Sequence, residues 1–180
     1  MYILITGAAG SGTSTLAAAF SEAAPSRHLE TDDYFWRPSD PPYRDKYDEE
    51  ERCLALLQDL RSSPSSVVAG SLIGWGDDLE DAFDLVVFLY LPTAIRMARL
   101  QLREERRFGK ADLAFLTWAA QYDAGTAEGR SLERHRHWLK QRKCPVLYLE
   151  GELSTEEQLQ RILAARLSLT PANRLGPTSL

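Results

Sequence analysis

The residues best spaced for chemistry are two glycines and a serine near the start of the chain, Gly7, Gly12 and Ser14. Glycine lets a backbone turn bring its N–H groups close to an anion, and a helix that follows adds its unpaired N–H donors. The apolar segment 2–5 precedes this run, and residues 15–20 are typical of a helix. The order strand, turn, helix predicts a phosphate-binding loop made of Gly7, Ala8, Ala9, Gly10, Ser11, Gly12, Thr13, Ser14 and Thr15.

This loop keeps the spacing G-x-x-x-x-G-K-[ST] except at the lysine, where Thr13 stands. Phosphate binding by backbone N–H groups does not need the lysine, and the Ser14 hydroxyl can still reach Mg²⁺. Thr13 cannot supply a mobile positive charge over the outer phosphates, so phosphoryl transfer requires another cation. The competing interpretation is an ordinary Gly/Ser-rich turn between a strand and a helix.

Three acidic residues lie at the end of a second predicted strand at 27–31: Glu30 is within it, and Asp32 and Asp33 follow it directly. Ligands gather at the carboxyl ends of strands in α/β sheets. A carboxylate there can take a proton from an attacking hydroxyl or hold Mg²⁺ through water. Asp is also a preferred residue at helix starts, so a capping role is the alternative. The cluster favours catalysis by Asp32 or Asp33.

An arginine-rich helix is predicted after Pro92, which suits a first helical position. We expect Ile95, Ala98 and Leu102 to form its buried stripe. A parallel basic stripe then contains Arg96, Arg99, Arg103, Arg106 and Arg107. Guanidinium groups bind phosphate or stack on a base, although a solvated face is the simpler alternative. We hypothesise that Arg103, Arg106 or Arg107 replaces the missing lysine.

Further pocket candidates lie near the ends of the second and third strands. Ser71 ends the strand at 67–71, Trp75 lies in the loop after it, and Tyr34 follows the acidic cluster. These three, with Asp32, are the predicted acceptor-binding residues, although aromatic residues in such positions often serve only in packing. His135 and His137 are two residues apart on a predicted helix and do not face one another, so we expect both on the surface.

Five strand-like segments alternate with helical ones, at 2–5, 27–31, 67–71, 84–91 and 144–149. This alternation predicts one α/β domain, a three-layer α/β/α sandwich around a five-stranded parallel sheet. The domain covers 1–168, a helical insertion at about 108–143 is placed to act as a lid, and 169–180 is a loose tail. Cys53 and Cys144 lie in apolar patterns and are expected to be reduced.

Composition limits the class of partner. The chain has 180 residues, 44% of them hydrophobic, and a net charge of −5. Residues 96–143 carry a local charge of +6 and the remainder −11, which argues against nucleic acid and favours a small polyanion. No segment reaches the roughly 18 apolar residues of a membrane span, and no basic leader precedes the first strand, so a cytoplasmic protein is expected. No pattern sets an oligomeric state.

With these motifs in place, the chain resembles the P-loop small-molecule kinases, such as nucleoside monophosphate, shikimate and uridine kinases. The resemblance implies a P-loop NTPase fold and ATP held by the loop at 7–15. It also implies Mg²⁺ bound by Ser14 and, through water, by Glu30, and acceptor contact or base catalysis by Asp32 or Asp33. Adenine and phosphate contacts fall to Arg99, Arg103 and the turn at Gly151. Catalysis by Arg103 or Arg107 is our own hypothesis, since it follows from the missing lysine.

One departure from the family limits the acceptor. The segment Gly70–Trp75 differs from the D-G-[FY]-P-R motif of adenylate kinases, so AMP is not implied. The expected function is transfer of the γ-phosphate of ATP to a small metabolite or nucleotide. The alternative is a non-catalytic or weakly hydrolytic nucleotide-binding module, in which Thr13 marks a degenerate loop.

Overall fold

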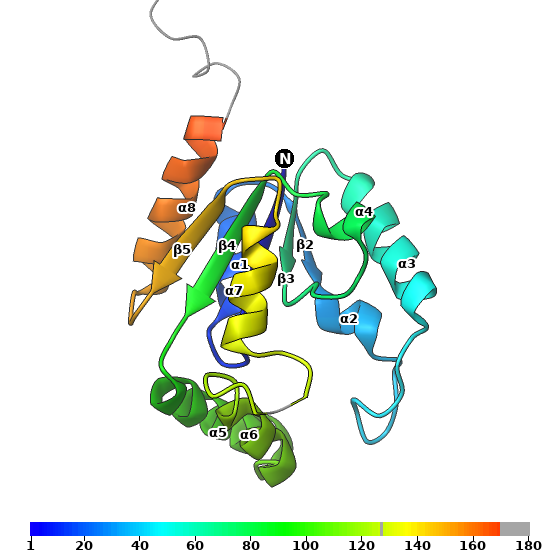
Figure 1. The fold of residues 1–180 in the computed structure, drawn as a ribbon, viewed down its shortest axis with the longest axis vertical. Helices are drawn as coiled ribbons and strands as arrows, with labels where there is room; N and C mark the ends of the chain where they lie inside the picture. The colour runs from blue at the N-terminus through cyan, green and yellow to red at the C-terminus, as the bar shows by residue number, and fades with distance from the viewer. Residues whose placement is uncertain (127, 170–180) are drawn as a thin grey trace, which may run out of the picture.

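A five-stranded, wholly parallel sheet forms the centre of the molecule in the computed structural model, which describes residues 1–126 and 128–169 (Figure 1). The strand order is β2-β3-β1-β4-β5. The middle strand β1 pairs with β3 and β4, and β2 and β5 lie at the edges. The strands are β1 (Tyr2–Gly7), β2 (Arg27–Glu30), β3 (Ser66–Ala69), β4 (Leu85–Tyr90) and β5 (Val146–Glu150).

Helices connect the strands, as expected of parallel neighbours, which cannot be joined by a tight hairpin. The last helix begins with a capping box: Glu157 Oε2 accepts from the Ser154 backbone N–H, and the Glu157 N–H donates to Ser154 Oγ. The described helices are α1 (Thr13–Ala23), α2 (Thr31–Phe35), α3 (Glu49–Arg61), α4 (Asp77–Glu80), α5 (Thr93–Phe108), α6 (Leu113–Ala120), α7 (Leu132–Lys140) and α8 (Thr155–Leu169).

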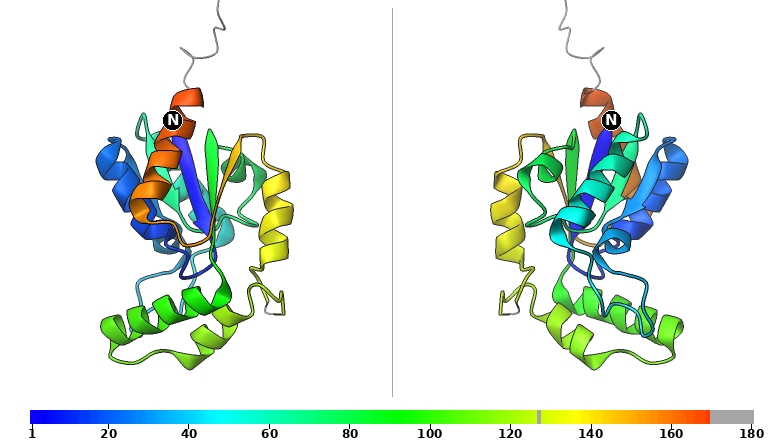
Figure 2. Two further views of the ribbon diagram at one scale, coloured as in Figure 1. Left: turned by 90° about the vertical axis from the view of Figure 1, so that its left-hand side faces the viewer. Right: turned by 90° about the vertical axis from the view of Figure 1, so that its right-hand side faces the viewer.

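The sheet is covered on both faces, which confirms the three-layer prediction (Figure 2). Ile3 and Ile5 of β1 point to one face and pack with Phe20 of α1 and Ile162 of α8. Leu4, between them, points to the other face, where α3, α4 and α7 contribute buried side chains. Both faces of each central strand are therefore apolar, as burial of a parallel sheet on two sides requires.

The carboxyl edge of the sheet gathers the loops that the sequence singles out. All strands run toward this edge, and α5 and α6 lie beyond it (Figure 1). The predicted lid segment 108–143 has two structurally different parts. α7 packs Trp138 and Leu139 into the core beside the sheet, whereas α6 packs on α5. Closure of the part before Ser131 over the site stays a prediction.

Two expectations concern the chain's ends and membranes. Most of the predicted tail, 170–180, lies outside the described residues, and Leu169 ends α8. Within 1–126 and 128–169, no helix combines the length and apolarity needed to cross a bilayer. Cys53 and Cys144 are both free thiols.

Candidate active site

The glycine loop joins β1 to α1 at the middle of the carboxyl edge. Gly10 and Gly12 have φ angles of 82° and 98°, which favour glycine. A Cβ on Gly10 would come within 2.8 Å of the Arg96 carbonyl oxygen. A Cβ on Gly12, by contrast, would meet no atom within 4 Å. The loop is thus packed tightly on its inner side and open at the start of α1.

This open start fits a bound phosphate. Gly12 occupies the N-cap and brings no side chain to the first N–H groups of α1, and the first turn contains no acidic residue. Those N–H groups have no acceptor within the helix, so they attract an anion. Ser11 Oγ is buried and has no hydrogen-bond partner among the described residues, a further donor left for a ligand. Thr13, at the lysine position, begins the helix.

Ser14 and Glu30 form the candidate magnesium site. Ser14 Oγ donates to Glu30 Oε2 at 2.9 Å, and Glu30 Oε1 lies 2.8 Å from His28 Nε2. Burial raises the pKa of Glu30, against the opposing effects of Ser14 and His28. Hard oxygen ligands suit Mg²⁺, which commonly takes its other ligands from phosphates and water. Phosphate and water ligands would be needed at this site, because no cluster of three metal-ligating side chains occurs in the described part of the chain.

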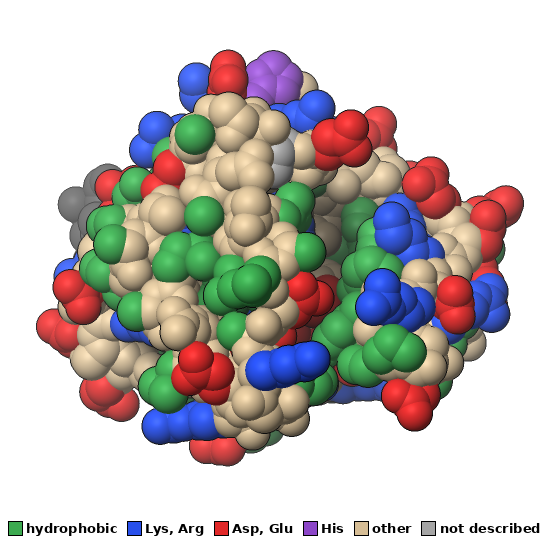
Figure 3. Space-filling model, turned by 90° about the horizontal axis from the view of Figure 1, so that it is seen from below, with side chains coloured by type: hydrophobic (Ala, Val, Ile, Leu, Met, Phe, Trp, Pro, Cys, Tyr) green, Lys and Arg blue, Asp and Glu red, His purple; other side chains and the backbone are tan. Residues whose placement is uncertain are grey.

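Asp32 and Asp33 lie in the first turn of α2, directly after β2. Both are exposed, and the helix N-terminus favours their negative charge. The charge of Asp32 acts on both Glu30 and Arg130. Packing holds α2 at this edge, since a Cβ on Gly70 would overlap Thr31 Oγ1 at 1.8 Å. Viewed from the carboxyl edge of the sheet, the surface is hollowed and acidic side chains lie in the hollow (Figure 3).

Helix α5 corrects the predicted stripes. Its buried residues are Arg96, Leu100 and Glu104, so the expected apolar stripe was wrong, and Leu102 is 48% exposed. Arg96 is fully buried rather than part of an exposed basic face. Arg96 can be buried because its guanidinium donates hydrogen bonds to several acceptors inside the protein.

Arg96 links the glycine loop to α6. Its Nη1 donates to the carbonyls of Ala9 and Ala119, both at 3.3 Å. Its Nη2 lies 3.4 Å from Asp123 Oδ1, which compensates the buried charge. A solvated position would have offered no such set of fixed acceptors.

The other arginines of α5 remain on the surface. Arg99, Arg103, Arg106 and Arg107 line an open groove with Leu102. Arg103 pairs with Glu104 at 3.1 Å. The predicted contacts of Arg99 and Arg103 with a nucleotide, and of Gly151 after β5, stay predictions.

A buried polar network lies beneath the site and corrects a second expectation. His135 of α7 is 0% exposed, so its predicted surface position was wrong. Its Nδ1 is 2.6 Å from the Tyr122 hydroxyl, and its Nε2 is 3.3 Å from Ser71 Oγ and 3.4 Å from Thr6 Oγ1. Burial, aided by Arg130, lowers the pKa of His135 to about 3. Ser71, a predicted acceptor contact, is thus engaged by a neutral imidazole.

The predicted aromatic contacts make packing interactions. Trp75 is 6% exposed and lies beside Phe35, with the Arg52 guanidinium 4.8 Å from its ring. Tyr34 donates its hydroxyl to Asp59 of α3 at 2.6 Å, and burial raises its pKa. Acceptor contacts by Tyr34 and Trp75 remain predictions.

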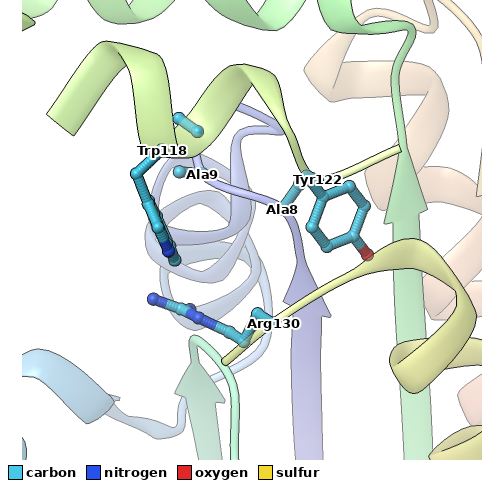
Figure 4. A pocket seen from close by; sticks show the side chains of 6 residues that line it. Ala8, Ala9, Trp118, Tyr122 and Arg130 are labelled. Atoms are coloured by element: carbon cyan, nitrogen blue, oxygen red, sulfur yellow. The ribbon is translucent and has the colours of Figure 1, made fainter. Parts of the chain in front are cut away.

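Arg130 is the site residue that the sequence did not single out. It precedes Ser131, the N-cap of α7, and lines a small cleft with Ala8 and Ala9 of the glycine loop. Trp118, Ala119 and Tyr122 complete the cleft (Figure 4). A lone arginine in a glycine-containing connection carries no recognisable spacing signal, so only the fold brings it to the loop.

This chain is similar in sequence to a known family and to one curated relative. A family model described as "AAA domain", AAA_18, matches residues 3–112. The uncharacterized protein YqaC of Bacillus subtilis (strain 168) is 42% identical over 171 residues, covering 89% of this chain and 94% of that protein.

Solved structures share the fold at low identity. A gluconokinase from Sinorhizobium meliloti 1021 has a TM-score of 0.59 at 20% identity, covering 92% of each chain. Shikimate kinase from Acinetobacter baumannii, in complex with shikimate, has a TM-score of 0.57 at 16% identity, covering 97% of this chain and 95% of that one. Deoxyadenosine kinase from M. mycoides, with bound dATP, has a TM-score of 0.59 at 16% identity, covering 93% of this chain and 100% of that one.

Proposed function

Because this chain belongs to the AAA_18 family of AAA domains and has the fold of P-loop small-molecule kinases, we propose that it is an ATP-dependent phosphotransferase. The acceptor is a small molecule with a hydroxyl or phosphate group. The observation that carries the proposal is the meeting, at one sheet edge, of an uncapped glycine-loop helix and a paired hydroxyl and carboxylate. Asp32 lies beside them with its charge acting on Glu30.

The loop residues would hold the phosphates of ATP. The first-turn N–H groups of α1 and the unpartnered Ser11 hydroxyl supply donors. Ser14 and Glu30 would hold Mg²⁺, Glu30 through water. When bound, this ion neutralises charge on the outer phosphates.

Asp32 is the proposed base. It accepts the proton of the acceptor hydroxyl as the acceptor oxygen bonds to the γ-phosphorus. The bond from that phosphorus to the bridging oxygen breaks, and ADP leaves with the bonding electrons. Asp33, which follows it on α2, acts electrostatically on Tyr34 and has no assigned proton transfer.

The test is ADP release with Mg²⁺-ATP across a panel of nucleosides, nucleotides, sugars and sugar acids. We expect at least one acceptor to stimulate release, and Asp32→Asn to lower that rate about 10²- to 10⁴-fold, the usual contribution of a general base. Asp33→Asn is the matched control and should retain most activity.

Two outcomes contradict the proposal. If no acceptor stimulates ADP release while ATP binds, a non-catalytic nucleotide-binding module is supported instead. If Asp33→Asn is inactive and Asp32→Asn is not, the assignment of the base is wrong.

A further inference from the structure

The phosphate loop needs a cation that its own sequence does not contain. Between Gly7 and Thr15 there is no charged side chain. The β- and γ-phosphates of a nucleotide carry several negative charges, and transfer requires that these be neutralised by more than backbone dipoles. A positive side chain from elsewhere in the fold must therefore approach the loop.

The arginines of α5 do not line the cleft at the glycine loop, and Arg99 and Arg106 line the open groove beside Leu102 instead. Arg96 is buried and already directed at the Ala9 and Ala119 carbonyls and at Asp123. Arg103 pairs with Glu104 and lies over the Phe115 ring. Arg107 lies against Tyr43 and Phe108. None of these contacts includes a residue of the loop other than the Ala9 carbonyl.

Arg130 has both the position and the free donors. It lines one small cleft with Ala8 and Ala9, and its guanidinium stacks 5.5 Å from the centre of the Trp118 ring (Figure 4). Among the described residues, its guanidinium makes this ring contact and no hydrogen bond or ion pair. Stacking on an indole face leaves the in-plane N–H groups of a guanidinium available, and these match a phosphate in pairs.

The electrostatics of Arg130 agree with an anionic ligand. Burial lowers the pKa of Arg130, and only Asp32 and Tyr122 oppose this effect. A partly buried cation without a paired acceptor is costly to the folded protein. A polyphosphate held by the adjacent loop would remove that cost.

We propose that Arg130 supplies, from across the cleft, the positive charge that a lysine at position 13 would otherwise supply to the outer phosphates of a bound nucleotide. This inference rests on the proposed function, since it needs a nucleotide in the loop. It replaces the hypothesis that Arg103, Arg106 or Arg107 has this role. A lysine introduced at position 13 and the arginine at position 130 should therefore be interchangeable sources of one charge.

The test compares the affinities of ATP and AMP, with Mg²⁺, by isothermal titration calorimetry. Arg130→Ala should weaken ATP binding about 10- to 100-fold, the range for loss of a hydrogen bond to a charged group. AMP lacks the outer phosphates, so its affinity should change less than about 3-fold. In a Thr13→Lys background, Arg130→Ala should weaken ATP binding by less than about 3-fold.

Controls separate this role from loss of folding. Arg136→Ala removes an exposed arginine of α7 and should leave both affinities unchanged. Arg130→Gln keeps most of the side-chain volume, so an unfolding temperature like that of the unsubstituted protein would show that its fold is intact. It should still lose ATP affinity.

Each contrary outcome has a distinct meaning. Unchanged ATP affinity in Arg130→Ala and Arg130→Gln overturns the inference. Equal losses for ATP and AMP, or an undiminished loss in the Thr13→Lys background, overturn it as well. No ATP binding by the unsubstituted protein refutes the proposed function itself.

Discussion

The buried imidazole of His135 should make the protein acid-sensitive in a way that one substitution removes. In the folded chain its pKa is about 3, because burial and the nearby Arg130 disfavour the charged ring. In the unfolded chain the pKa returns to about 6.5. Below pH 6.5 the unfolded state therefore binds a proton that the folded state does not, and the free energy of unfolding falls as the pH falls.

The size of this effect follows from the two pKa values. Each pH unit between about 6.5 and about 3 lowers the free energy of unfolding by about 1.4 kcal/mol. At pH 7.5 the contribution is close to zero, and at pH 5.0 the loss is about 2 kcal/mol. That is a large part of the roughly 5–15 kcal/mol that stabilises a typical domain.

The measurement is urea unfolding at pH 7.5 and pH 5.0, with His135→Gln as the test variant. Glutamine does not titrate but can still donate and accept hydrogen bonds toward Tyr122 and Ser71. His135→Gln should lose about 2 kcal/mol less than the unsubstituted protein between the two pH values. Carboxylates that become protonated affect both proteins alike, so the difference isolates His135.

His137, on the same helix, is exposed and provides the matched control. His137→Gln should keep the full pH dependence of the unsubstituted protein. If His135→Gln shows that same pH dependence, His135 is not buried as a neutral ring and the reasoning is refuted.

Two further predictions concern packing around the site, both measured by chemical or thermal unfolding. Gly10→Ala should lower the free energy of unfolding by about 1–3 kcal/mol, because φ is 82° and the new Cβ meets the Arg96 carbonyl oxygen at 2.8 Å. Gly12→Ala, whose Cβ has open space around it, should cost less. Equal losses in the two variants would contradict the steric argument. Glu80→Gln should lower the free energy of unfolding by about 3–5 kcal/mol, because it leaves the buried Arg142 side chain without the carboxylate that lies 3.2 Å away. An unchanged urea midpoint would show that Asp81 alone compensates the charge of Arg142.

The sheet could be predicted from sequence because its signal is local. Each central strand is a short apolar run, and burial on both faces is what such runs imply. The loop from Gly7 to Ser14 could also be predicted from sequence, since its glycines, its hydroxyl and its flanking elements all lie within one short segment. The predicted fold class is confirmed for these reasons.

The site was harder to predict because it depends on polar residues buried by tertiary contacts. Arg96 and His135 lie on the inward faces of their helices. A prediction from residue type and periodicity places polar side chains such as these on the solvent-exposed face. On α7 the inward face is marked by Leu132, Trp138 and Leu139, and His135 falls on it at helical spacing. That spacing was the available signal for His135. Arg130 had none, because its neighbours in the cleft come from the loop and α6.

Arg96 also has a consequence for binding affinity. By fixing the Ala9 carbonyl and the Ala119 carbonyl from one planar group, it ties the loop's shape to the position of α6 before any ligand arrives. The conformational entropy of ordering the loop is then lost during folding rather than on association. The loop is preorganised, and a ligand's contacts with it translate more fully into affinity. A lysine in place of Arg96 could not reproduce this, because its one ammonium nitrogen cannot also make the bonds that Nε and Nη2 of Arg96 donate to the Leu91 carbonyl and to Asp123.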